Sequence, residues 1–293
     1  MFVVMLYYFV IGRNFLQPYV LNPIYEFFGI YPLSSWLRIL NAFFRDLGLP
    51  TLVYILYTIF AKKKCCLMFS MSRLSLKNVL YISVITLTIR VIFSLIENGI
   101  PFFFNGGVVS MQTFYFMDIG QSLLHNAILA TLFEEFVFRG FLWGEYRQQH
   151  VSYWKIALAT GLFFGIIHLG TFNMFHTTIS GIFFYAPLIY FTRSIWSPIL
   201  HHAIMNGTYT LISPTFYINN QADFNEFMPI YLIILISVAI ILSPLAIICG
   251  KRFYQENKHN AQTREKLPPE SKMFRLTYWS LILIMMATFL RAF

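Results

Sequence analysis

Three charged side chains lie inside one otherwise apolar stretch, residues 121–143 (QSLLHNAILATLFEEFVFRGFLW). Glu134 and Glu135 are adjacent, and Arg139 follows the second carboxylate by four residues. On a helix, neighbouring residues point about 100° apart, whereas residues four apart share a face. We therefore expect Glu135 and Arg139 to pair and to fix the helix. Glu134 then suits a general base, which takes a proton from water and returns it to a leaving amine. The alternative is one buried ion network of all three.

Two further apolar stretches carry histidine and asparagine. His168 lies in FFGIIHLG, and His202 and Asn206 lie in SPILHHAIMNGTY with a spacing that puts them on one helical face. A His/Asn pair on one face can supply hydrogen-bond donors to a developing negative charge. A single membrane histidine more often packs than reacts, but the His202/Asn206 coincidence favours chemistry. His201 points about 100° from His202, so we expect a structural role for it.

The same residues leave the cofactor unknown, either none or zinc. One carboxylate and two imidazoles, from Glu134, His168 and His202, form a plausible zinc set with a fourth position for water. They work equally as a metal-free glutamate site, and no HExxH motif occurs. The three cysteines, Cys65, Cys66 and Cys249, lack the spacing of a structural zinc site.

The elements that position these residues are membrane helices. Of the 293 residues, 58% are hydrophobic and 11% are charged, against about 45–50% apolar and 25% charged in ordinary soluble domains. The fold class predicted is all-α, a polytopic transmembrane bundle of eight to nine spans, whose polar groups need a water-filled cavity near mid-membrane. The spans are expected near 1–12, 46–61, 78–96, 121–143, 156–171, 178–192, 196–212, 229–249 and 276–290.

The basic residues predict an orientation and account for the net charge of +9 without a nucleic-acid partner. Segments 62–77, 144–155 and 251–275 are rich in Lys and Arg, as cytosolic loops are, whereas the alternating loops contain neither. Those outer loops are 97–120, 172–177 and 213–228. We expect 251–272 to be a polar linker on the cytosolic membrane surface, in contact with anionic headgroups. Membrane lipid and a peptide or protein substrate are the predicted partners.

Three ordered motifs carry a resemblance to a known family. Glu134-Glu135-x3-Arg139, Phe164-x3-His168 and His202-x3-Asn206, each on its own predicted helix, resemble the CAAX-protease and bacteriocin-processing (Abi) family. The resemblance covers roughly 120–212, which divides the chain into N-terminal spans (1–119), a catalytic core (120–212) and C-terminal spans with the basic linker (213–293).

The resemblance implies an α-helical intramembrane endopeptidase. The type member of the family removes the last three residues after a prenylated cysteine. By position, Glu134 aided by His168 would activate water, and His202 with Asn206 would stabilise the oxyanion. Glu135 and Arg139 would hold the site together, and Phe164 would shape the cavity by packing.

Two other functions remain alternatives. Relatives of this family include non-catalytic immunity or regulatory membrane proteins, which use their helices as binding surfaces. Buried Glu and His chains also form proton relays in transporters, although no convincing inverted repeat supports that hypothesis here.

Overall fold

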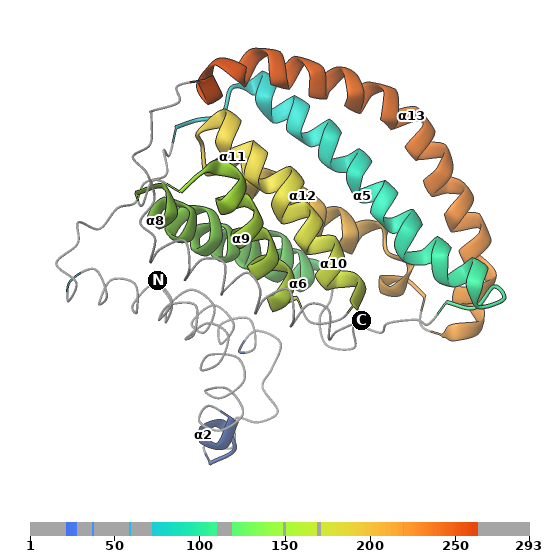
Figure 1. Ribbon diagram of the computed structural model, residues 1–293. Helices are drawn as coiled ribbons and strands as arrows, with labels where there is room; N and C mark the ends of the chain where they lie inside the picture. Colours follow the sequence, from blue (N-terminus) through green and yellow to red (C-terminus); the bar gives the residue numbers. More distant parts are fainter. Residues whose placement is uncertain are drawn as a thin grey trace. The chain divides into compact units, whose positions relative to one another are not determined.

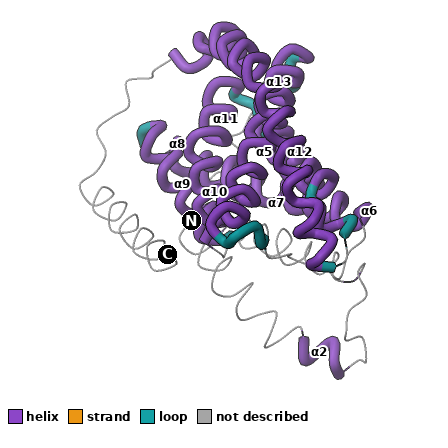
Figure 2. Tube along the Cα trace, turned by 90° about the vertical axis from the view of Figure 1, so that its right-hand side faces the viewer, coloured by secondary structure: helices purple, strands orange, loops and turns teal. Residues whose placement is uncertain are grey.

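The structure is a computed structural model, and it describes residues 22–27, 37, 59, 72–109, 119–148, 151–168, 171–218 and 220–262. Within these residues the secondary structure is helical, and no strand occurs. Figures 1 and 2 show coiled segments joined by short connections. The described part therefore confirms the all-α prediction.

The chain divides into two compact units, which are described separately. Unit 1 comprises Met1–Ser70, Leu129–Ala186 and Lys266–Phe293, and unit 2 comprises Met71–Ile128 and Pro187–Glu265. Apart from a short helix α2 (Asn22–Phe27), the described elements of unit 1 follow one another between residues 129 and 186. They are α7 (Thr131–Glu135), the π-helix η4 (Phe136–Leu142), α8 (Trp143–Gln148), α9 (Tyr153–Ile167), α10 (Thr171–Ser180) and the π-helix η5 (Gly181–Tyr185).

Glycines bring the helices of unit 1 into backbone contact. A Cβ atom at Gly165 would overlap Thr178 Oγ1, and one at Gly181 would lie 2.6 Å from the Cα atom of Gly161. Small residues at such positions let membrane helices approach closely. The packing of α9 against α10 and η5 therefore depends on glycine at these positions.

Unit 2 is built around the long helices α5 (Leu76–Phe104) and α13 (Gln221–Gln262), which pack against each other (Figure 1). Ser75 begins α5 by accepting a hydrogen bond from the Asn78 backbone N–H at 3.1 Å. The side chains of Asn78 and Asn257 then exchange hydrogen bonds of 2.9 and 3.2 Å between the two helices. The other elements are α6 (Ile119–Ser122), the π-helix η3 (Leu123–Ala130, which runs into unit 1), α11 (Ala186–Thr192), α12 (Trp196–Ile212) and the 3-10 helix η6 (Pro214–Phe216).

The predicted span 121–143 is helical throughout, but it alternates between α- and π-helical turns. Thr131–Glu135 is a short α segment between the π segments Leu123–Ala130 and Phe136–Leu142. π-helical turns are rare and occur frequently at functional sites. The two adjacent carboxylates therefore lie at a local change of helical pitch.

Three helical stretches are long and apolar enough to cross a membrane, namely Leu76–Phe104, Met174–Thr192 and Gln221–Asn260, and Tyr153–Ile166 is a shorter apolar helix. These helices indicate an integral membrane protein, whereas the number of eight to nine spans stays a prediction. The expected spans 1–12 and 276–290 lie outside the described residues, as does 46–61 apart from Ile59.

Three predicted boundaries are wrong in detail. The expected outer loop 172–177, which contains His176, lies within helix α10, and α5 continues to Phe104, past the expected start of another loop at residue 97. The expected linker begins as helix, because α13 extends to Gln262. Neither Thr171–Ser180 nor Lys251–Gln262 contains Gly or Pro, so no residue interrupts a helix there. The expected ends of these helices had been predicted only from the polarity of the segments.

Candidate intramembrane active site

Glu135 and Arg139 form the ion pair that their spacing predicts. Arg139 Nη1 donates to Glu135 Oε1 at 3.1 Å, and both side chains are 0% exposed. The fold needs both members of such a buried pair, since removing one partner leaves an uncompensated buried charge.

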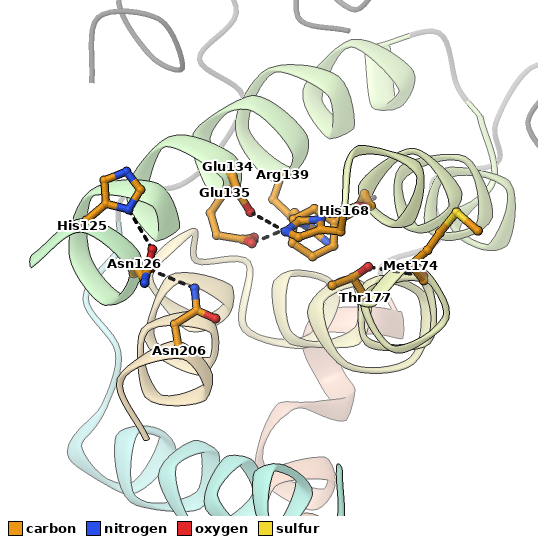
Figure 3. Close-up of polar contacts among 10 residues, drawn as sticks. His125, Asn126, Glu134, Glu135, Arg139, His168, Met174, Thr177 and Asn206 are labelled. Atoms are coloured by element: carbon orange, nitrogen blue, oxygen red, sulfur yellow. Dashed lines mark hydrogen bonds and ion pairs between the residues drawn. The ribbon is translucent and has the colours of Figure 1, made fainter. Parts of the chain in front are cut away.

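Glu134 points toward a different partner, the imidazole of His168 (Figure 3). Glu134 Oε2 lies 3.6 Å from His168 Nε2, and their side chains are 16% and 28% exposed. Glu134 is therefore not the isolated carboxylate expected from the helix spacing alone. It approaches the histidine with which the family resemblance associated it.

The end of α9 positions His168. The helix ends at Ile167, and the His168 backbone leaves helical geometry at φ −93° and ψ 76°, with its N–H bonded to the Gly165 carbonyl at 2.9 Å. The side chain turns back, so that Nδ1 lies 2.7 Å from the carbonyl oxygen of Phe164. His168 thus follows directly after the end of α9, whereas the predicted range 156–171 continued past it.

This contact fixes the tautomer of the neutral ring. A carbonyl oxygen only accepts hydrogen bonds, so Nδ1 must carry the proton and donate it. Nε2 then presents a lone pair toward the carboxylate of Glu134 when the ring is neutral. Glu134 Oε2 and His168 Nε2 are then two acceptors that face each other across 3.6 Å. They can share one proton, or each can accept one hydrogen of a single water molecule.

Helix α12 places His202 and Asn206 in unit 2. His202 is 3% exposed, and Asn206 is half-buried one turn further along the helix. Asn206 Nδ2 donates to the backbone carbonyl of Asn126 at 2.9 Å (Figure 3). The carboxamide of Asn206 is therefore held in one orientation by the backbone of η3.

A ring of hydrogen bonds supports that orientation. Asn126 Nδ2 donates to Ser122 Oγ at 3.0 Å, and Thr210 Oγ1 lies 3.4 Å from the same oxygen. Thr210 Oγ1 also donates to the Asn206 carbonyl at 3.1 Å, which closes the ring. His125 adds to it, because its Nδ1 lies 2.7 Å from Asn126 Oδ1 and must donate to that oxygen.

His201 has the structural contact expected for it. Its side chain is buried, and Nδ1 lies 2.7 Å from Thr86 Oγ1. The single hydroxyl proton of Thr86 is donated to the Ile82 carbonyl at 2.6 Å. His201 Nδ1 therefore donates to the threonine oxygen and links α12 to α5.

Sequence reasoning missed a second buried charge, Arg90 on α5. Its guanidinium contacts Glu97 Oε2 at 2.9 Å and Ser94 Oγ at 2.8 Å, and it lies 4.8 Å from the ring centroid of Tyr209. An arginine inside the apolar range 78–96 was the available signal. Ser122, Asn126 and Thr210 gave no comparable signal, because they are ordinary polar residues in a membrane helix.

The residues of the predicted zinc set lie in both units, Glu134 and His168 in unit 1 and His202 in unit 2. Zinc in a hydrolase takes three protein ligands around an open position, and two of the predicted ligands, Glu134 and His168, lie 3.6 Å apart in unit 1. Among the residues that the structure describes, no group of three or more His, Cys, Asp or Glu side chains gathers closely enough to hold a metal.

These observations define an α-helical integral membrane protein that carries a carboxylate–imidazole pair in unit 1. Residues 118–208 match the family model described as Type II CAAX prenyl endopeptidase Rce1-like. The match confirms the family resemblance that the three motifs indicated, and the matched segment contains all of the motif residues. No curated protein and no solved structure matches the chain.

Proposed function

We propose that this chain is an intramembrane endopeptidase that hydrolyses a peptide bond in a membrane-associated or prenylated protein or peptide, as in CAAX processing. The proposal is carried by the approach of Glu134 to His168 at 3.6 Å inside a segment that matches the Rce1-like family. The family match supports protease activity, and the residue roles below are part of the proposal.

In the proposed reaction, one water molecule lies beside Glu134 and His168. It donates one hydrogen to Glu134 Oε2 and the other to His168 Nε2. Its oxygen attacks the carbonyl carbon of the peptide bond while Glu134 accepts one proton. Glu134 then returns this proton to the amide nitrogen as the C–N bond breaks, which releases a carboxylic acid, still carrying the second proton of the water, and an amine. No covalent intermediate with the protein is required.

His202 and Asn206 are proposed to stabilise the oxyanion formed in the first step. The Asn206 amide nitrogen has two N–H groups, and one is donated to the Asn126 carbonyl. That bond orients the second N–H, which can then serve the oxyanion without reorganisation. The assignment of both sets to one centre follows the family motifs.

Glu135 and Arg139 are proposed to support the site without contacting substrate. Both are fully buried and paired with each other. Their pairing fixes the rotation of the helix that also carries Glu134, so the neighbouring carboxylate is presented in a defined direction.

The test is cleavage by the purified full chain in detergent. Wild type and Glu134→Gln are compared on a fluorogenic panel of farnesylated CAAX peptides and hydrophobic leader peptides, each with and without a chelator. Glu226→Gln, an exposed carboxylate on α13, makes the same chemical change elsewhere and serves as the matched control. Folding of the three proteins is compared by thermal unfolding.

The proposal expects cleavage by wild type and by Glu226→Gln, and none by Glu134→Gln. The peptide that is cleaved identifies the substrate class, and the chelator arm separates metal-dependent from metal-free chemistry. Failure of folded wild type to cleave any peptide would contradict the protease proposal and favour the immunity or regulatory function.

A further inference from the structure

Tyr185 lies outside the three sequence motifs, yet its ring contacts the residues that they define. It is the last residue of the π-helix η5, and its side chain is 3% exposed. The ring centroid lies 5.4 Å from that of Phe164 and 4.5 Å from the guanidinium carbon of Arg139. All three residues belong to unit 1.

The Arg139 guanidinium lies over the rings of Phe138, Phe164 and Tyr185, and the last two are nearest. Its guanidinium carbon lies 4.5 Å from the ring centroid of Phe164, the same distance as from Tyr185. The ion pair with Glu135 uses Nη1, whereas Nε and Nη2 have no hydrogen-bond acceptor among the described residues. The electron-rich ring faces therefore supply much of the stabilisation of this buried cation.

Glycine makes room for this arrangement. Gly181 begins the same π segment, and a Cβ atom there would lie 3.4 Å from Arg139 Nη2. The absent side chain leaves space for the guanidinium, while η5 approaches α9 closely enough for Tyr185 to cover it.

Phe164 connects the arginine to the histidine. Its ring centroid lies 4.7 Å from that of His168 in an edge-to-face arrangement, and its carbonyl accepts from His168 Nδ1. The Phe164 ring therefore contacts both the Arg139 guanidinium and the imidazole beside Glu134.

We propose that Tyr185 is a positioning residue of this site: its ring face, together with Phe164, immobilises Arg139 and thereby holds the His168 imidazole at its working distance from Glu134. The inference rests on the proposed endopeptidase function, but its physical content is a cation–π contact that can be tested without turnover.

The experiment replaces Tyr185 by Phe, by Leu and by mono-, di- and trifluorinated phenylalanines in the full chain. Fluorine withdraws electron density from the ring face and leaves the shape of the side chain nearly unchanged. Two readouts are collected: kcat and KM on the farnesylated peptide, and the ¹⁵N chemical shift of His168 against pH by NMR, assigned with a His168→Gln sample.

Tyr185→Phe keeps the ring face and is the reference for the fluorinated series. The fluorinated series should lower kcat in steps and shift the His168 titration curve, with KM unchanged because the ring is buried against Arg139 and Phe164. Complete loss of a buried cation–π contact corresponds to about 30-fold in rate, so we expect roughly tenfold for the trifluorinated ring. Tyr185→Leu, if it folds, should be at least as impaired.

Two results would overturn the inference. One is a fluorinated series with unchanged kcat and an unchanged His168 titration; the other is a Tyr185→Phe protein as impaired as the trifluorinated one. If wild type cleaves no peptide, the His168 titration still decides the positioning role, so failure of the proposed function and failure of this inference are distinguishable.

Discussion

His168 Nε2 lies 3.6 Å from Glu134 Oε2, too far for a direct hydrogen bond and close enough for one water molecule to contact both atoms. The other ring nitrogen, Nδ1, donates to the Phe164 carbonyl. The lone pair of the neutral ring is therefore on Nε2 and faces the Glu134 carboxylate. In the proposed reaction this pair holds the water molecule that Glu134 deprotonates.

Removal of the base is expected to stop the chemistry and leave the fold intact. Glu134→Gln keeps the shape of the side chain but accepts no proton, so kcat should fall by about 10³-fold or more, within the range for loss of a general base. Peptide cleavage measures this, with Glu226→Gln as control. A Glu134→Gln protein that retained a tenth of the wild-type kcat would contradict the assignment of the base.

The buried ion pair predicts a non-additive effect on stability. Arg139→Met leaves Glu135 charged and without its ion-pair partner, and should cost about 3–5 kcal/mol. Adding Glu135→Gln removes that charge and should recover a large part of the loss. Thermal unfolding in detergent of both single variants and the double variant measures the coupling, and additive losses would argue against a direct pair.

Asn206 is expected to contribute to the transition state rather than to substrate binding. Loss of one oxyanion donor typically lowers kcat about 10²–10³-fold, so Asn206→Ala should reduce kcat in this range with little change in KM. Ser122→Ala, which removes only a member of the supporting hydrogen-bond ring, should reduce kcat a few-fold. Steady-state kinetics distinguishes the two, and a rise in KM alone for Asn206→Ala would contradict the assignment.

The glycine contact between α9 and α10 predicts that position 165 tolerates no side chain. Gly165→Ala would force a Cβ atom against Thr178 Oγ1, and overpacking of this kind typically costs about 1–3 kcal/mol. Gly250→Ala on α13 meets no atom within 4 Å and provides the matched control, with unchanged or slightly raised stability. Equal thermal unfolding temperatures for the two variants would show that the helices separate easily.

The helical fold and the Glu135–Arg139 pair were predictable because they depend on local rules. Composition indicates lipid as the solvent, and a four-residue spacing places two side chains on one helical face. The bounds of the expected helix at 196–212 agree with those of α12, Trp196–Ile212.

The partners supplied by other helices were not predictable. Tyr185 reaches Arg139 only because η5 follows π-helical geometry and Gly181 allows close packing, and neither property follows from hydrophobic periodicity. The Asn126 carbonyl that accepts the hydrogen bond from Asn206 is a backbone group, so no residue type in the sequence indicates this contact. The position of His168 depends on the helix ending at Ile167, and end positions are the least regular part of a helix.

The length of α13 bears on the kind of bilayer that suits this protein. Its exposed isoleucines run from Ile230 to Ile248, a rise of about 27 Å at about 1.5 Å per residue, close to the roughly 30 Å of a hydrocarbon core. The helix continues with Lys251 and Arg252, and further on Asn257 pairs with Asn78. A thicker bilayer would draw these charges into lipid, whereas a thinner one would expose isoleucine to water, so hydrophobic matching by this one helix selects membranes of ordinary thickness.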